Sequence, residues 1–353
     1  RLAIVPNIAR SNIGCDINFH APSLPGGISV KSHTIPRSLS SFPILFEAKA
    51  DAPIEGGLCS FEIEDPKTKL KGPFTEKISH LYVNNQGDYH ITHTEKISIA
   101  VIEEAPFHLE LFAPPVPLVR NGTMTLKITA NRVNDFNKKI KVKLPWKPPG
   151  IGAPTEVEIP EGKNEVSLIL NATGDAPIND WKILVTGEAA TDEGTVRVSS
   201  QFADLKTSEP FVNLTIAMAA TNPGKNTSVI AAVDHLEPFT GEARVILHAL
   251  PHGVKSNEKK ITSTSAEVTF PLEVAKDARK GKHANLFCQV IIVKDGHPIS
   301  HNVGQGGTLR IDPPPPAPKK KPEAKAAPVK TQQKVVPKKP LSRLEQLRQS
   351  QKQ

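Results

Sequence analysis

Apolar and polar residues alternate along much of the chain with a period of two. The segments 123–131 (TMTLKITAN), 164–170 (NEVSLIL) and 181–187 (WKILVTG) each place apolar side chains on one face and polar ones on the other. This pattern predicts half-buried antiparallel strands. Pro, Gly, Asn and Asp separate these strands at intervals of roughly 8 to 15 residues, and Asp295-Gly296 is a strong hairpin signal.

One longer pattern occurs three times: a polar turn, an apolar strand and a corner of small residues. The three copies align without gaps at 35–54, 159–178 and 261–280. The centre of each corner is an Asp: Asp51, Asp175 and Asp277. A Leu-Pro pair followed by Gly precedes each copy, at Leu24, Leu144 and Leu250. Strands of the second and third copies recur about 105 residues apart, which indicates a domain rather than a solenoid repeat.

Seven or eight strands in ~100 residues, without a helix to cover one face, must bury their apolar sides against a second sheet. We therefore predict an all-β chain of tandem immunoglobulin-like β-sandwiches. The predicted units are 1–104, 105–208 and 209–312. The first is partial, as if its opening strands lay upstream of Arg1, and it carries a hairpin insertion near 65–95.

The repeated corner is the place where one strand ends and the chain crosses to the other sheet. Asp can cap such a turn through its side-chain oxygen, and Pro sets φ and removes a donor that the corner could not satisfy. The repetition is therefore topological. None of the three Asp residues starts a ladder of carboxylates of the calcium-loop kind, so no metal is predicted.

The positive charge of the chain is confined to its last segment. Residues 313–353 carry 11 Lys or Arg against 2 acidic residues, whereas the first 312 residues carry 33 against 34. The folded part thus has no basic surplus for nucleic acid. The tail, rich in Pro, Lys and Ala, predicts a disordered segment with a short helix at 342–350. Its lysines could tether the protein to an acidic envelope polymer or protein: Lys319, Lys320, Lys321, Lys338 and Lys339.

Motifs for catalysis are missing from the sequence. There is no GxSxG, HExxH or complete phosphate loop, so we predict neither catalytic residues nor a cofactor. The pairs His90/His93 and His297/His301 have unsuitable spacing for shared ligation by a strand. The cysteines are Cys15, Cys59 and Cys288, and we expect three separate thiols, with a Cys15–Cys59 disulfide as the alternative in an oxidising compartment.

Three residues are candidate ligand contacts. Trp146 lies in the proline-rich loop LPWKPPG, where an exposed indole could anchor a sugar or peptide, whereas Trp181 lies in an alternating strand and is expected in the core. Asn85 and Asp88 lie near the tip of the inserted hairpin, and loops on a rigid scaffold often carry binding residues. A plain elaboration without a partner is the alternative for this hairpin.

Several phrases carry a resemblance: ADAPIEGG (50–57), the stretch 99–132, LPWKPPG (144–150), the stretch 283–312 and the lysine-proline tail ending in PLSRLEQLRQ. Together they resemble the C-terminal portion of large exported bacterial proteins that carry pre-peptidase C-terminal domains, some of them labelled subtilase-like serine proteases. The resemblance covers nearly the whole chain. It implies an extracytoplasmic, multi-domain, mostly β protein, and no catalytic residue carries over from it.

These observations favour non-catalytic spacer, adhesion or interaction modules at the C-terminus of a larger exported protein. Two alternatives remain: an accessory region of an exported serine protease whose catalytic domain lies upstream, and a glycan-binding module that uses Trp146. No apolar run reaches the ~18 residues that a transmembrane helix needs. The predicted location is the periplasm, the cell surface or the surrounding medium.

Overall fold

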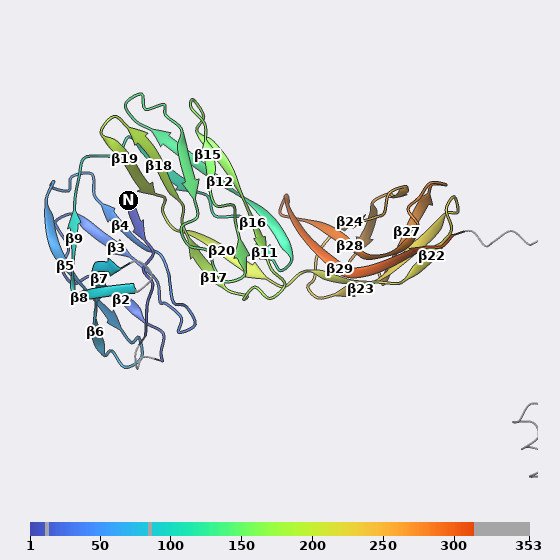
Figure 1. The fold of residues 1–353 in the computed structure, drawn as a ribbon, viewed down its shortest axis with the longest axis horizontal. Helices are drawn as coiled ribbons and strands as arrows, with labels where there is room; N and C mark the ends of the chain where they lie inside the picture. Colours follow the sequence, from blue (N-terminus) through green and yellow to red (C-terminus); the bar gives the residue numbers. More distant parts are fainter. Residues whose placement is uncertain (11–13, 84–86, 314–353) are drawn as a thin grey trace, which may run out of the picture. The chain divides into compact units, whose positions relative to one another are not determined.

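The computed structural model describes residues 1–10, 14–83 and 87–313, and for some residues next to 84–86 it describes only the backbone. Every regular element in this described part is a β-strand (Figure 1), which confirms the predicted all-β class. The predicted basic tail, with its short helix at 342–350, lies outside the described residues.

The first sandwich has two layers of antiparallel strands. One layer has the order β1-β4-β3 and contains β1 (Leu2–Ile4), β4 (Ile44–Ala48) and β3 (Ile28–Lys31). The other layer is built around β5 and contains β2 (Asn18–His20), β5 (Gly56–Glu64), β6 (Lys71–Phe74) and β9 (Lys96–Ala100). Between β6 and β9 the chain forms a separate hairpin of β7 (Glu76–Val83) and β8 (Gly87–Thr94).

The second sandwich repeats this arrangement with more strands. Its first layer contains β10 (Phe107–Leu111), β12 (Gly122–Arg132), β16 (Glu165–Ala172) and β14 (Ile151–Gly152). Its second layer contains β15 (Val157–Ile159), β13 (Ile140–Lys143), β18 (Thr186–Thr191) and β19 (Gly194–Ser199). A three-stranded sheet from the same stretch of chain contains β11 (Leu118–Val119), β20 (Ala203–Ser208) and β17 (Asp180–Ile183).

The third sandwich follows the strand order of the second. One layer contains β21 (Val212–Ile216), β23 (Thr227–His235), β27 (Glu267–Val274) and β25 (Val254–Ser256). The other contains β26 (Lys259–Thr262), β24 (Glu242–His248), β28 (Gly281–Lys294), β29 (His297–Ile311) and β22 (Ala219–Thr221). In both sandwiches a short strand pairs in parallel with the last long strand, β11 with β20 and β22 with β29.

The predicted alternation of side chains is visible in the burial of individual strands. In β27 every second residue is buried, from Val268 through Phe270 and Leu272 to Val274, and the residues between them are exposed. Each such apolar side chain that leaves water contributes about 1.5–3 kcal/mol to folding. The sandwich is therefore the arrangement that lets two half-apolar sheets cover each other.

The buried apolar side chains form two clusters, although the sequence predicts three units. One cluster combines residues of the first and second sandwiches, such as Phe42, Ile44, Leu126 and Ile183, and the other lies mainly in the third. Residues Arg1–Pro313 form one compact body. The boundaries predicted near 104 and 208 stay predictions, although none of the described strands crosses either.

The corner that repeats in the sequence carries the chain from one sheet to another, as predicted. β4 leads to β5 and β27 to β28 in the opposite layer, and β16 leads to β17 in the three-stranded sheet. The corner is held by a contact with the other repeated feature of the sequence, the glycine that follows each Leu-Pro pair. The residue after each outgoing strand donates its backbone N–H to a glycine carbonyl, as in Lys49 N to Gly27 O (3.0 Å), Thr173 N to Gly150 O (2.9 Å) and Ala275 N to Gly253 O (2.8 Å).

Each of these glycines is the third residue of a turn that begins at a proline. Gly27, Gly150 and Gly253 have φ values of 75°, 73° and 81°, the left-handed region that a type II turn requires at this position. The glycines also pack closely against an alanine of the corner, because an added Cβ would lie 2.6 Å from Ala52 Cβ or 2.7 Å from Ala176 Cα. We call this glycine–alanine contact the clasp. The clasp explains why the small-residue corner and the glycine after the Leu-Pro pair occur together in every copy.

Strand pairing joins the second and third sandwiches. Gly122 and Thr123 of β12 pair with His301 and Ser300 of β29, so that one sheet continues from one sandwich into the next. Asn302 donates its N–H to the Asn121 carbonyl (2.9 Å). A side chain at Gly122 would collide with the Ser300 carbonyl, since a Cβ there would lie 2.8 Å from its oxygen. The junction therefore needs glycine at this position.

Candidate functional site

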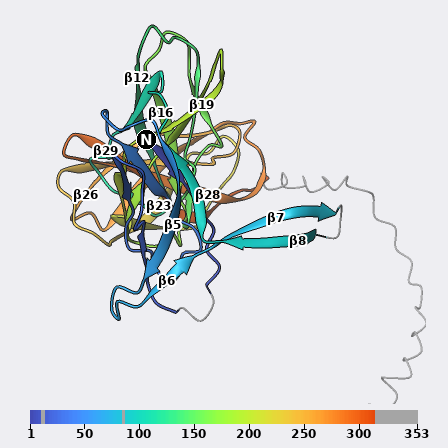
Figure 2. The same ribbon diagram turned by 90° about the vertical axis from the view of Figure 1, so that its left-hand side faces the viewer.

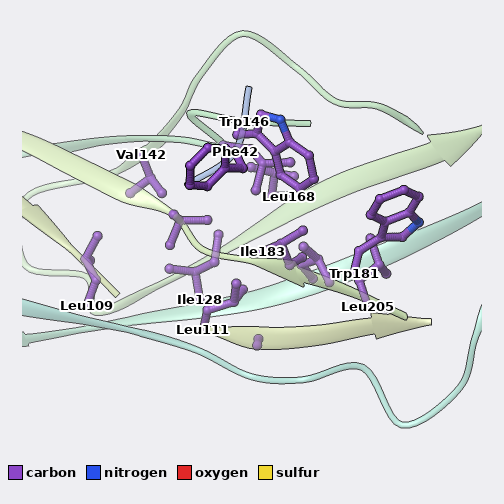
Figure 3. Packing of buried hydrophobic residues seen from close by; sticks show 14 of the residues in the cluster. Phe42, Leu109, Leu111, Ile128, Val142, Trp146, Leu168, Trp181, Ile183 and Leu205 are labelled. Carbon is purple, nitrogen blue, oxygen red and sulfur yellow. The ribbon is translucent and has the colours of Figure 1, made fainter. Parts of the chain in front are cut away.

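Trp146 is buried, so the prediction of an exposed anchor in its loop is wrong. Its exposed fraction is 7%, and its ring lies 6.1 Å from that of Trp181 at an interplanar angle of 63°. Figure 3 shows both indoles among apolar side chains that include Leu168 and Ile183. The loop leads from β13 in one layer to β14 in the other, so its large ring fills space between the layers. Trp181 is buried as predicted.

The other predicted contact residues receive no side-chain description. Asn85 lies outside the described residues, and Asp88 belongs to β8 with its side chain outside the description. The tail lysines Lys319, Lys320, Lys321, Lys338 and Lys339 also lie outside. Their proposed roles stay predictions.

The repeated aspartates do not gather into one site. Asp175 accepts a hydrogen bond from the Thr173 hydroxyl at 2.6 Å, and this bond lowers the pKa of its carboxyl group. Each corner is closed by backbone hydrogen bonds, such as Ala278 N to Ala275 O at 3.1 Å. Within residues 1–10, 14–83 and 87–313 there is no group of three or more His, Cys, Asp or Glu residues placed to hold a metal ion.

The cysteines and His301 behave as packed residues, whereas His297, the other member of the second histidine pair, is exposed. All three cysteines are free thiols, with Cys59 and Cys288 buried and Cys15 half-buried. Burial raises the pKa of Cys288 to about 12. His301 is 1% exposed, and neither of its ring nitrogens makes a hydrogen bond. Desolvation lowers its pKa to about 4, and the nearby Val212 backbone offsets this effect only in part.

A cleft of about 680 Å³ lies where the first and second sandwiches meet, within the compact body. The first sandwich contributes the ends of β2 and β3, one residue of β5 and one of β6. The second contributes Lys182 of β17 and Phe202, which precedes β20. The rings of Phe202 and His33 meet edge to face, with centroids 6.1 Å apart. Outside the cleft, a hydrogen bond from Ala3 N to Ser199 Oγ (2.8 Å) also joins the two sandwiches.

Three ammonium groups line this cleft, from Lys31, Lys71 and Lys182. Each has a carboxylate partner: Lys31 pairs with Glu47 at 2.5 Å, Lys71 with Glu62 at 3.4 Å, and Lys182 with Asp204. These lysine side chains are 44–57% exposed, so the pairs contribute little to stability. An ammonium group has three N–H donors, and one carboxylate does not use all of them.

Two imidazoles of the cleft keep a buried nitrogen without a hydrogen bond. They are Nδ1 of His33 and Nε2 of His20, the latter 3.4 Å from Glu64 Oε2 but outside hydrogen-bond geometry. Burial lowers the pKa of His33 because the imidazolium is desolvated, and the Lys182 ammonium adds to this effect. A buried polar atom without a partner costs about 1–3 kcal/mol, so a ligand that supplies the partner gains this amount.

No motif in the sequence indicated this cleft. Lys31 and Lys182 belong to different sandwiches, and neither is part of a motif. The one available signal was weak: His20 and His33 lie close together in the chain at the ends of two short strands. Only the meeting of the two sandwiches places them opposite Lys182 and Phe202.

No protein-family model and no curated protein matches the chain. Solved structures do match. Over 59% of its length the chain is similar to the whole of a protein of unknown function from Porphyromonas gingivalis W83, at 9% identity and a TM-score of 0.23. Over 58% it is similar to 94% of the fibronectin(III)-like modules of Clostridium thermocellum CbhA (11%, TM-score 0.20). Over 57% it is similar to 59% of the Yersinia pseudotuberculosis adhesin InvE (12%, TM-score 0.20).

The class of this protein follows from its own strand order: it is an all-β module of successive sandwiches. Among the residues with described positions, no helix is long and apolar enough to cross a membrane.

Proposed function

We propose that this chain is a non-catalytic interaction segment of a larger exported bacterial protein, in which the sandwiches act as spacer and adhesion modules. Export and the larger protein rest on the resemblance to exported proteins with pre-peptidase C-terminal domains. The interaction role rests on one structural feature, the β7–β8 hairpin of the first sandwich.

The hairpin is a sheet of its own. In the described part of the chain, β7 and β8 pair only with each other, and Figure 2 shows the two strands standing clear of the sandwich layers. Ile78 pairs with Thr92 and Ile91 pairs with Ser79, so the two isoleucines lie on opposite faces of the ribbon. Their exposed fractions are 39% and 40%.

Such a ribbon is hard to explain by folding alone. A single two-stranded hairpin is marginally stable in water, and the edge of a sheet is a common place for another chain to add a strand. Apolar side chains on both faces add to this tendency. A partner that pairs with one edge or covers one face would stabilise the ribbon and bury its exposed isoleucines. This makes the hairpin the best candidate for a contact arm.

The arm can be removed without breaking the sandwich. Glu76 and Thr94 face each other at its base, so an Asn-Gly turn can replace residues 77–93. We expect the intact chain to co-sediment with purified envelope fragments of a Gram-negative bacterium, and the excised variant to be retained at least ~5-fold less. The double variant Ile78→Thr/Ile91→Thr keeps the ribbon and tests its apolar faces separately. Equal retention of intact and excised chains, or no retention of either, would contradict the interaction role of the arm.

The complete reading frame tests the remainder of the proposal. A signal peptide followed by further sandwiches would support an exported spacer or adhesin. A Ser/His/Asp domain upstream would favour the accessory region of a protease instead. The absence of any export signal from the full reading frame would overturn the extracytoplasmic assignment.

A further inference from the structure

We infer that the cleft between the first and second sandwiches is a binding site for an acidic saccharide, a ligand that carries both carboxylate and hydroxyl groups. This site lies in the described body and does not involve the hairpin. The inference goes beyond the proposed function and does not depend on export.

The donors of the cleft call for an anion. Lys31, Lys71 and Lys182 approach it from three strands of two sandwiches, and each keeps N–H donors beyond its one carboxylate partner. A hydrogen bond between an ammonium and a carboxylate is about twice as strong as one between neutral groups. A ligand carboxylate can therefore share or replace the weak, exposed pairs that these lysines now make.

The same cleft also holds acceptors and apolar surface. The Glu62 carboxylate lines it, and Nδ1 of His33, which has no hydrogen bond, can accept or donate one. Nε2 of His20 also has no hydrogen bond, although it faces Glu64 at 3.4 Å. Phe202 and Pro22 add apolar walls. Sugar hydroxyls donate and accept, and the C–H face of a sugar ring packs on apolar surface. The volume of the cleft, about 680 Å³, lies within the usual range of about 300–1,000 Å³ for ligand sites.

An acidic peptide is the competing ligand, and the edges of the cleft disfavour it. A peptide would gain most of its affinity by adding a strand to a free sheet edge. Four edge strands contribute residues to the cleft: β2, β3, β6 and β17. Each has only three or four residues, which is too short to guide a long added strand. The mixed set of donors and acceptors suits a hydroxylated ring better.

Isothermal titration calorimetry of the full chain with trigalacturonic acid at low salt tests the site. We expect binding of the acid, no binding of the neutral trisaccharide of galactose, and a loss of affinity as salt rises. Lys31→Ala and Lys182→Ala should each weaken binding at least ~5-fold. Lys260→Ala is the matched control, since Lys260 makes the same kind of exposed cross-strand pair, with Glu242 at 2.7 Å, outside the cleft.

His33 provides an independent readout. An anion favours the protonated ring, so affinity should increase as the pH falls from about 7 to about 5. The charged groups that face the two rings are Lys182 beside His33 and Glu64 beside His20, and Glu62 also lines the cleft. The increase should vanish in His33→Gln. Unchanged thermal unfolding of each variant shows that the fold is intact.

Several outcomes would overturn the inference. They are no heat with trigalacturonic acid, equal binding of the neutral trisaccharide, and equal affinities of Lys182→Ala and Lys260→Ala. Binding of a triglutamate peptide in place of the saccharide would assign the cleft to an acidic peptide. None of these results bears on envelope retention through the hairpin, so the two proposals fail separately.

Discussion

The corner between the two layers is built alike in all three sandwiches, whereas the connection between the last two long strands differs in each. The clasp recurs with the same hydrogen bonds at Gly27, Gly150 and Gly253. By contrast, β18 and β19 form a short hairpin, and β28 and β29 form a long one of 14 and 15 residues. In the first sandwich β6 and the β7–β8 hairpin are inserted between β5 and β9.

The difference separates what a sandwich needs from what it can vary. Each copy must cross from one layer to the other at the corner, and a left-handed glycine in close contact with an alanine permits few substitutes. The connection between the last strands lies at the end of the sandwich, where added residues meet solvent. Substitutions at the corner should therefore lower the stability of the fold. Substitutions in the connection between the last two long strands should lower it only where they change a buried group.

The largest effect is expected on the corner side, from Trp146→Ala. The indole lies in the loop that leads to the clasp at Gly150, and its loss leaves a cavity next to Trp181. We expect the free energy of unfolding to fall by about 3–5 kcal/mol in urea denaturation followed by the fluorescence of Trp181. Trp146→Phe should lose clearly less. A loss below about 1 kcal/mol would mean that the ring is not part of the core.

The clasp itself can be separated from ordinary backbone strain. Gly253 and Gly241 lie in the third sandwich with φ values of 81° and 78°, but only Gly253 has a neighbour that a Cβ would meet, Ala278 Cα at 2.8 Å. Gly241→Ala should cost about 1–2 kcal/mol through backbone strain alone. Gly253→Ala should cost about 3–4 kcal/mol, measured by chemical denaturation. Equal losses would show that the contact adds nothing.

The long hairpin of the third sandwich should show a pH effect through His301. Its pKa is lowered from 6.5 to about 4, so between these pH values the ring is protonated in the unfolded chain and neutral in the folded chain. Stability should therefore fall as the pH drops from 6.5 to about 4 and then level off. At about 1.4 kcal/mol per pKa unit this is about 3 kcal/mol.

The variant His301→Leu isolates this contribution. Carboxylates titrate in both proteins, so the difference in unfolding free energy between them reports His301 alone. We expect that difference to widen as the pH falls from 6.5 to about 4. A difference that stays constant over this range would contradict burial of the neutral ring.

The smallest effect on stability is expected from excision of the hairpin. Residues 77–93 belong to a sheet of their own, so their replacement by Asn-Gly should change the unfolding free energy by less than about 0.5 kcal/mol. Thermal unfolding of the intact and excised chains should coincide. A large loss of unfolding free energy would show that the arm supports the sandwich, and would argue against a role as a contact arm.

Local signals were sufficient for the all-β fold class. The alternation in 123–131 and 164–170 identified β12 and β16, and the two repeated marks identified the crossing between layers. They failed for Trp146. Its proline-rich loop indicates an exposed turn when read locally, yet the loop spans from one layer to the other and carries its ring between them. Asp175 accepts a hydrogen bond within its corner, from the Thr173 hydroxyl, and the predicted capping by Asp51 and Asp277 stays a prediction. No local pattern indicated the backbone contact with glycine.

The amino-acid order alone determined the all-β class, the repeated corner and the burial of Trp181, because alternation with period two and the turn chemistry of Pro, Gly and Asp act over a few neighbouring residues. The tertiary structure decided the clasp, the burial of Trp146 and the cleft. Each of these depends on which segments distant in the chain come into contact. Lys31 and Lys182 share a cleft only because two sandwiches pack together, and no local pattern encodes that contact.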